Sequence, residues 1–346
     1  MTPHPWLEQI VSQPRLRLSV PLRVAQGKRF QPTGFPDLGA ATYRLPDGTE
    51  MLLLESAQSV ANRLEAVCWD PLAGESVPEL RSLPYVRVRL AGENGDEQMT
   101  SSVLEAHRLN SPYILKATRP GSSAEFREEL RTRAGIPAKG KKSSAEDEEG
   151  EVAGEGVLNL QRIAKAVFYY DPSSVLHGLF LAGLDGRVRL TRALSGFVEA
   201  AGVREAVSGG VKLDRVHAAG ETKEGYGNVP YHRVEFVAES IVAHFSLDLA
   251  LLRSYDLGDD ARRLFTALAL WKIRRFLAAG LRLRTACDLE LGPTEKLPVE
   301  LTQPTETDLF GALEEAMTAC RGQWADPPVT ELVYTLGTKD EKRSKK

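Results

Sequence analysis

Regular alternation of apolar and polar residues is the feature that most restricts how this chain of 346 residues can fold. In the first such segment, every even-numbered residue from Leu16 to Val24 is apolar, whereas the odd positions include Arg15, Arg17 and Arg23. Successive side chains of a β-strand point to opposite faces, so this spacing predicts a strand with one buried face and one face in water. We therefore expect a sheet whose two faces differ.

Four further segments repeat the pattern, namely 85–90, 187–190, 241–249 and 281–291. The polar side of three of them carries arginine: Arg87, Arg89, Arg187, Arg189, Arg282 and Arg284. Tyr85 falls on the polar side of its segment. The run from Val234 to Ala238 has the opposite register to 241–249, which predicts a bulge or break near Glu239. The sequence thus predicts several one-sided strands.

A first helix is predicted directly after a strand-like apolar run. Ser56 is placed to cap this helix, which extends to about Cys68. Its buried stripe contains Val60, Ala61, Leu64 and Val67, and its polar side contains Gln58, Ser59, Asn62 and Arg63. The i, i+4 spacing places these polar side chains together on the surface of the helix.

Two more helices follow towards the end of the chain. The stronger one, 261–279, is predicted to be capped by Asp259 or Asp260 and to end at Gly280. The other follows Thr305 or Thr307. Helices interspersed with one-sided strands predict an α+β fold in which helices cover one side of a sheet.

Two segments have compositions that predict disorder. Residues 137–156 contain almost no apolar side chains, and five acids lie between Glu146 and Glu151. Such a segment buries too little apolar surface to offset the entropy cost of ordering it. The basic tail 337–346 is of the same kind. Between them, residues 296–336 are predicted to form a C-terminal helix and strand.

The charge distribution leaves a nucleic-acid partner open. A formal net charge of -3 argues against binding to phosphates, which relies on uncompensated lysine and arginine. However, residues 14–36 hold five cations and no acid. Arginine on the exposed strand faces suits phosphate contacts and stacking on bases, although a salt-bridged surface would explain the same pattern.

Two loops combine basic, aromatic and glycine residues, and both are candidates for nucleic-acid contacts. They are 26–36, after the first strand, and 225–233, before a later one. Glycines let a backbone approach a phosphate, and the rings of Phe30, Phe35, Tyr226 and Tyr231 offer flat faces for bases. The alternative is that these rings anchor the loops in the core. We favour binding.

Motifs for catalysis and metal binding are weak. Residues 135–142 are a near-match to a phosphate-binding loop, but Lys142 replaces the required hydroxyl residue and a linker explains them better. The acids of Gly258-Asp-Asp are better explained by a helix start than by magnesium. No histidine has metal-ligand spacing, so we expect no metal or other cofactor. RNA cleavage assisted by His107, His217 or His232 stays open.

The remaining signals concern the compartment. The three cysteines, Cys68, Cys287 and Cys320, are far apart and odd in number, which indicates buried thiols and not a disulfide framework. No uncharged apolar run approaches the roughly 20 residues that span a bilayer, and the N-terminus lacks the features of a secretory signal. We therefore expect a cytoplasmic protein without membrane contact.

Three motifs resemble a known family. They lie at 29–41 (RFQPTGFPDLGAA), 52–65 (LLLESAQSVANRLE) and 227–233 (GNVPYHR). In this order they resemble the RAMP protein of type I-U, now I-G, CRISPR systems, which is the Cas-seven-family backbone subunit of the Cascade effector complex. The likeness extends from about residue 12 to 295. The middle motif, which contains Gln58, Asn62 and Arg63, is the most specific.

The resemblance implies a fold and a function. The fold would be a RAMP palm over 12–295, similar to an RNA-recognition (ferredoxin-like) domain, with insertions that act as thumb and fingers. The protein would bind CRISPR RNA, stack head to tail with copies of itself, join other Cascade subunits, and meet target DNA through the guide. The expected RNA contacts are Lys28, Arg29, Gln31, Thr33, Gln58, Asn62, Arg63, Tyr226, Asn228, His232 and Arg233.

The resemblance also bears on catalysis. Type III relatives cut RNA with an aspartate in the loop after the first strand, where this chain has Asp37, but no partner acid is evident beside it. We assign no catalytic residue and expect a non-enzymatic protein. The alternative is a RAMP endoribonuclease that processes CRISPR repeat RNA with a histidine as general base.

Overall fold

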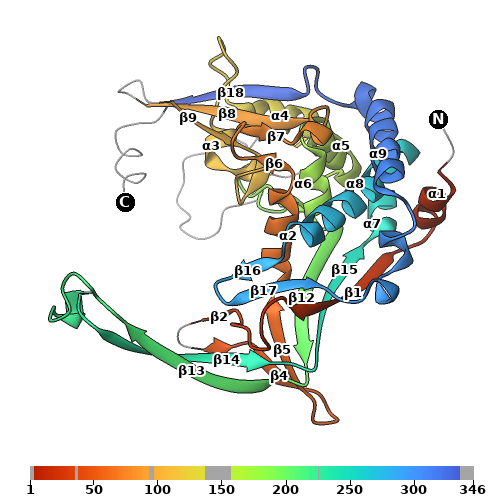
Figure 1. Cartoon of the computed structure of the whole chain (residues 1–346). Helices are drawn as coiled ribbons and strands as arrows, with labels where there is room; N and C mark the ends of the chain where they lie inside the picture. The colour runs from red at the N-terminus through yellow and green to blue at the C-terminus, as the bar shows by residue number, and fades with distance from the viewer. Residues whose placement is uncertain (1–3, 36–37, 93–96, 137–156, 225, 336–346) are drawn as a thin grey trace.

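The computed structural model describes residues 4–35, 38–92, 97–136, 157–224 and 226–335. They form a mixed α+β fold with a central antiparallel sheet, a helical layer, a smaller sheet and a projecting two-stranded arm (Figure 1). In order across the central sheet, the strands are β16 (Arg282–Arg284), β17 (Cys287–Leu291), β1 (Leu16–Val24), β15 (Ser240–Leu247), β12 (Leu194–Ala201), β5 (Glu50–Glu55) and β4 (Thr42–Arg44).

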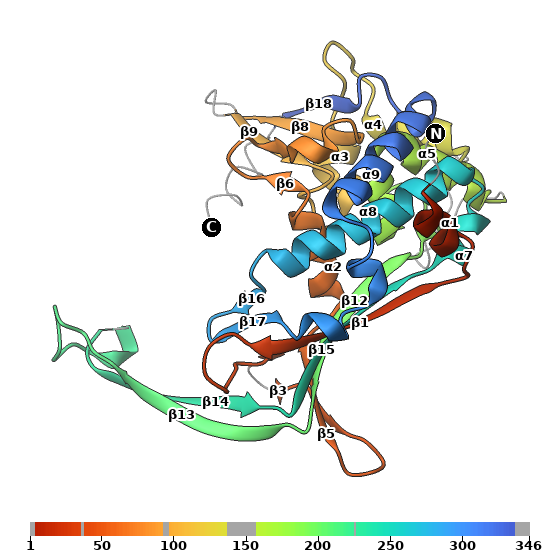
Figure 2. The same cartoon turned by 45° about the vertical axis from the view of Figure 1, so that its right-hand side comes forward.

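Helices cover one face of this sheet. Helix α2 (Ala57–Ala66) lies on the chain path from β1 to β12, and α8 (Asp259–Ala278) connects β15 to β17. Both lie on the same side of β1, β15 and β12, as Figure 2 shows. The even-numbered residues of β1 from Leu16 to Leu22 are buried against this layer, because alternate side chains of a strand share one face. Helices α1 (Pro5–Val11) and α9 (Glu306–Cys320) pack against α8.

A smaller sheet and a second group of helices complete the body. In the sheet, β8 (Tyr85–Ala91) pairs in parallel with β18 (Val329–Thr335) and antiparallel with β9 (Glu97–Ser101). The helices are α3 (Pro112–Leu115), α4 (Phe126–Ala134), α5 (Leu160–Tyr170), α6 (Pro172–His177) and α7 (Leu249–Ser254). Short two-stranded pairs are β2 (Gly34–Phe35) with β3 (Gly39–Ala40), β6 (Trp69–Asp70) with β7 (Glu75–Ser76), and β10 (Leu179–Phe180) with β11 (Arg189–Leu190).

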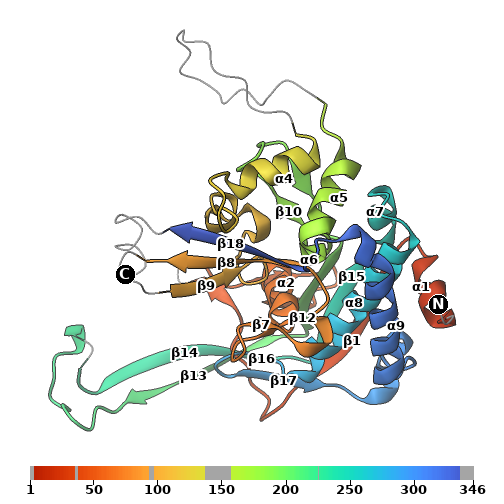
Figure 3. The same ribbon diagram turned by 90° about the horizontal axis from the view of Figure 1, so that it is seen from above.

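The arm consists of β13 (Arg204–Lys212) and β14 (Val229–Val237), which pair with each other along their whole length. It extends away from the body in all three views (Figure 3). Most of its side chains are exposed, and only those near its base are buried. The arm therefore offers a long surface without a core of its own.

Most of the predicted elements are present. Strand β1 has the expected alternation, and the predicted break near Glu239 separates β14 from β15. Ser56 caps α2 by accepting a hydrogen bond from the Ser59 backbone N–H. Thr305, and not Thr307, caps α9, in a capping box with Asp308. Residues 137–156 and 337–346, which were predicted to be disordered, lie outside the described residues.

Three predicted strands are corrected by the structure. Of segment 187–190 only Arg189–Leu190 forms a strand, β11. The segment 281–291 is a hairpin, β16 and β17, and not one strand, because the chain turns at Ala286, whose φ is 59°. Segment 241–249 ends at Leu247, because Asp248 caps α7 and Leu249 begins that helix. Alternation alone does not reveal such turns, since buried residues can keep the same parity on both sides of a turn.

Two further corrections concern single residues. Tyr85 was predicted on the polar side of its strand but is only 3% exposed, because its ring packs edge-on against Trp69. Asp259 and Asp260 do not cap α8, whose N-cap is Gly258. They occupy the first turn instead, where acids are favoured by the helix dipole, and pair with Arg262 and Arg263.

No helix in the described ranges is both long enough and apolar enough to cross a membrane.

Candidate nucleic-acid interface

A hollow of about 1060 Å³ lies where the arm joins the body. Its walls come from three parts of the chain: the loop after β1 with β2 and β3, the base of β13 and β14, and the turn after β16. Four residues that the sequence singled out line this hollow: Gln31, Thr33, His232 and Arg233. The structure thus brings the two candidate segments together, although about 200 residues separate them in the sequence. It corrects the second one, which was predicted to be a loop but belongs to strand β14 from Val229 on.

Phe30 joins the loop after β1 to the arm. Its backbone N–H donates to the Phe236 carbonyl, and the Phe236 N–H donates back, each at 2.9 Å. The Phe30 side chain is fully buried, so the prediction that its ring is free to stack on a base is wrong. Burial of an aromatic side chain typically stabilises a fold by a few kcal/mol, so Phe30 can anchor the loop to the arm. Lys28 and Arg29, which precede it, remain exposed.

Two arginines share one buried acid at the base of the arm. The buried carboxylate of Glu235 lies 3.3 Å from Arg29 and 3.7 Å from Arg233, and it accepts a hydrogen bond from Ser208 at 2.9 Å. One carboxylate thus neutralises only one of two guanidinium groups. Within this cluster one guanidinium charge is left to attract a phosphate, although Glu205 adds an acid to the lining of the hollow.

A second pair of arginines shares another buried acid. Glu55, which is 2% exposed, pairs with Arg63 and with Arg284. Arg284 lines the hollow and donates to the carbonyl oxygens of Gln31, at 3.3 Å, and Leu54, at 3.0 Å. This contact fixes the loop after β1 relative to the central sheet.

Arg63 was predicted to lie on the water-facing side of α2, and the structure corrects this. Its side chain is 30% exposed, and its guanidinium donates to Glu55 and to the Leu283 carbonyl. The arginine therefore links α2 to β5 and β16. Helical spacing could not show this, because Glu55 precedes the helix and Leu283 is remote in the sequence.

Gln58 and Asn62 are exposed on α2, as predicted, but they do not line the hollow. The Gln58 amide donates to Asn62 at 3.0 Å and accepts a hydrogen bond from Arg192 at 2.7 Å. Arg192, which sequence reasoning missed, also donates to the His177 and Ala57 carbonyls. Burial lowers the pKa of Arg192, and the nearby Arg108 charge lowers it further.

The far end of the arm carries the remaining candidates. Tyr226 is 53% exposed, and the Asn228 side chain accepts a hydrogen bond from the Asp214 backbone at 3.0 Å. The Asp214 carboxylate accepts from three backbone N–H groups, which holds its pKa below the ordinary value. These contacts order the turn that presents Tyr226.

Two other aromatic predictions have different outcomes. Tyr231 is 49% exposed, and the Arg233 guanidinium lies 5.8 Å from its ring centroid, so both can face a ligand in the hollow. The side chain of Phe35 and all of Asp37 lie outside what the structure describes.

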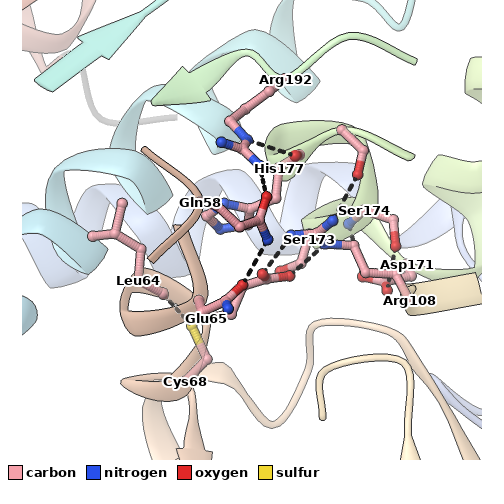
Figure 4. Close-up of polar contacts among 12 residues, drawn as sticks. Gln58, Leu64, Glu65, Cys68, Arg108, Asp171, Ser173, Ser174, His177 and Arg192 are labelled. Carbon is pink, nitrogen blue, oxygen red and sulfur yellow. Dashed lines mark hydrogen bonds and ion pairs between the residues drawn. The ribbon is translucent and has the colours of Figure 1, made fainter. Parts of the chain in front are cut away.

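A buried polar cluster lies between α2, α6 and α8 (Figure 4). Glu65 and Arg108 form a two-bond ion pair at 2.6 and 2.5 Å, and Arg108 also donates to the Gly178 carbonyl. The Lys272 ammonium donates to Ser173 at 3.2 Å and lies 2.9 Å from the Nε2 atom of His177. All of these side chains belong to residues that are at most 7% exposed, so a polymeric substrate cannot reach them.

His177 makes the stability of the fold depend on pH. Burial, followed by the charge of Lys272, lowers its pKa well below the ordinary value of about 6.5. Below about pH 6.5 the unfolded chain therefore binds a proton that the folded chain does not, and stability falls as pH falls. We expect wild type to lose about 1.4 kcal/mol more than His177→Gln between about pH 7.5 and 5.5.

Urea unfolding of both proteins at the two pH values measures this difference. Buried Asp171 has a raised pKa, which acts in the opposite direction, but it is present in both proteins and cancels in the comparison. Identical pH profiles for wild type and His177→Gln would contradict the assignment.

The histidines considered for RNA cleavage are dispersed. His232 lines the hollow, His217 lies edge-on to Tyr226 in the turn of the arm, and His107 precedes the short helix Arg108–Asn110. Gly135 ends α4 in a left-handed conformation, as expected of a linker and not of a phosphate-binding loop. Within the described ranges, no group of three or more potential ligands is placed to hold a metal.

Comparison with known proteins gives one family. Residues 16–205, more than half of the chain, match the model of the family described as CRISPR-associated protein GSU0053. No curated protein matches the sequence significantly. Among solved structures, the chain is similar to one described as "CRISPR RNA-guided surveillance complex, pre-nicking", with 15% identity and a TM-score of 0.40. That match covers 80% of this chain and 76% of the other.

Proposed function

The chain belongs to the CRISPR-associated GSU0053 family, and from this membership we propose that it is an RNA-binding backbone subunit of a type I Cascade complex. The observation that carries the proposal is the hollow at the base of the arm. Arg233 and Arg284 line it, and Arg29 lies beside it through its pair with Glu235; the acids there are the buried Glu235 and Glu55 and the lining residue Glu205. Tyr231 adds an aromatic ring. Sites that bind single-stranded RNA typically combine cations, which contact phosphates, with aromatic rings, on which bases stack.

The strand order supports a palm of the RNA-recognition type. Strands β17, β1, β15 and β12 are consecutive neighbours in the sheet, and all pair antiparallel. Helices α2 and α8 provide the two crossovers on one face. Strand β5, strand β4 and the arm are then insertions into this palm, and the arm is the proposed finger.

The projecting arm supports assembly of copies along the guide. Its surface is mostly exposed and has no core to bury, so a neighbouring copy or the RNA can cover it. In such an assembly each copy would hold the RNA backbone and leave bases to pair with target DNA. The three motifs at 29–41, 52–65 and 227–233 favour type I-U/I-G for this system.

We further propose that the subunit does not cut RNA. The histidines of the described residues are either buried or dispersed, as His177, His217 and His107 illustrate. The alternative is an endoribonuclease that processes repeat RNA, for which His232, exposed at the hollow, is the candidate general base. It predicts cleavage that is lost in His232→Ala.

Co-expression with a CRISPR array tests the proposal. The purified chain is expected to elute as a large assembly with a raised 260/280 nm absorbance ratio and to protect guide RNA from nuclease. Sequencing the extracted RNA identifies the guide. An RNA-free monomer would contradict the backbone role. Shortened repeat RNA that depends on His232 would favour the endoribonuclease.

A further inference from the structure

The open face of the central sheet carries an aromatic and polar surface that is separate from the hollow at the arm. Direct cross-strand pairing places Ser19, His244 and Phe197 in one row across β1, β15 and β12. The adjacent row consists of Arg17, Ser246 and Ser195. These six residues, which we call the sheet-face site, line a hollow of about 280 Å³.

The first row provides a stacking platform. Phe197 is 37% exposed, and its ring lies 5.0 Å from that of His244, with an angle of 30° between the two planes. The imidazole is held from both sides, because its Nδ1 lies 3.1 Å from the Ser19 hydroxyl and its Nε2 lies 3.5 Å from Glu199. Tyr43 in turn donates to Glu199 at 2.9 Å. An exposed ring with a fixed neighbour can stack on a base at low entropy cost.

The second row provides a cation and hydroxyl groups. Arg17 is exposed and forms no ion pair with the part of the chain that the structure describes. The hydroxyls of Ser195 and Ser246 line the hollow beside it. Two rows on one face lie about 7 Å apart along a strand, a spacing over which one nucleotide can place its base on one row and its phosphate on the other.

The charges give the ligand a direction. Glu199 lies beyond the aromatic row and would repel a phosphate there, whereas Arg17 lies at the opposite end. The volume is near the lower limit of about 300–1,000 Å³ for ligand pockets, so it suits one base and not a larger ligand. Serine hydroxyls can also bond to the 2′-hydroxyl that distinguishes RNA from DNA.

We propose that the sheet-face site binds one unpaired nucleotide of single-stranded RNA, with its base on Phe197 and His244 and its phosphate on Arg17. The proposal rests on the proposed RNA-binding function and adds a second contact outside the hollow at the arm. The RNA could then follow the body of the subunit as well as the base of its arm.

The test uses the full chain freed of RNA and an oligoribonucleotide that carries a fluorescent adenine analogue. Stacking is expected to quench the analogue when wild type binds. Phe197→Leu keeps an apolar side chain without an aromatic face, and it should lower affinity by about 5- to 150-fold and abolish the quenching. Phe197→Trp should retain both. The matched control is Phe180→Leu, because Phe180 is 42% exposed on another surface.

The outcomes separate this site from the proposed function. Unchanged affinity and quenching in Phe197→Leu would overturn the sheet-face site, while RNA binding by wild type would leave the function intact. Failure of wild type to bind RNA at all would overturn both. A deoxyoligonucleotide of the same sequence should bind more weakly, and equal binding would contradict the assignment to RNA.

Discussion

Replacing both Arg29 and Arg233 by glutamate is expected to weaken binding of single-stranded RNA by roughly 100-fold at physiological salt. Each guanidinium that binds a phosphate contributes about 1.5–3 kcal/mol, so removing two corresponds to at least about 3 kcal/mol. The slope of log affinity against log salt should also fall by about 0.7 for each phosphate that is no longer neutralised. Fluorescence anisotropy over a series of salt concentrations measures both quantities.

Two control proteins make the result specific to the hollow. Lys116→Glu with Arg321→Glu changes the net charge equally at exposed positions outside the hollow. Arg29→Gln with Arg233→Gln removes the two cations without placing new carboxylates beside Glu235, so its RNA affinity should decrease less than that of the glutamate variant. Equal decreases in the two glutamate proteins would indicate general charge attraction and contradict a local site.

Removing one partner of the Glu65–Arg108 pair is expected to destabilise the fold by about 3–5 kcal/mol, because it leaves an uncompensated charge in the interior. Among the described residues, Glu65→Leu leaves Arg108 with a single partner, the Gly178 carbonyl. The double variant Glu65→Leu with Arg108→Met removes both charges. It should be at least about 2 kcal/mol more stable than Glu65→Leu alone.

Urea unfolding of wild type, Glu65→Leu, Arg108→Met and the double variant provides the measurement, with the coupling obtained as a double-mutant cycle. Arg119 and Glu129 are a suitable control pair, since they form two hydrogen bonds at 2.8 and 2.7 Å but are 45% and 36% exposed. Their coupling should stay below about 1 kcal/mol. A similarly small coupling between Glu65 and Arg108 would contradict the prediction.

Alternation predicted the central sheet well because the helical layer buries only one of its faces. In β1 the buried positions follow the alternation from Leu16 to Leu22, and Val24 at the end of the strand is half-buried. The same rule failed for 281–291, where the turn at Ala286 joins two strands that bury residues of the same parity. The prediction for Tyr85 failed for another reason. Trp69 packs against the Tyr85 ring and covers the face of the strand that was expected to be exposed.

The candidate site was predictable in its residue types but only partly in its geometry. Composition pointed to the two loops, and the structure joins them through the Phe30–Phe236 pairing. No local pattern connects these two residues, since the pairing is a property of the tertiary fold. Phe30 was misassigned for this reason, whereas Gln31, Thr33, His232 and Arg233 do line one hollow.

The two arginines that share Glu55 have a consequence for how variants of this protein should be interpreted. Positions 55, 63 and 284 form one electrostatic unit that joins α2, β5 and β16. A change at Arg63 would leave Glu55 with Arg284 as its cation and the Ser59 hydroxyl as its other donor, and it would shift the loop that Arg284 holds at Gln31. Weaker RNA binding in such a variant would then indicate a displaced loop and not a missing phosphate ligand. Related sequences should accordingly change at these three positions together.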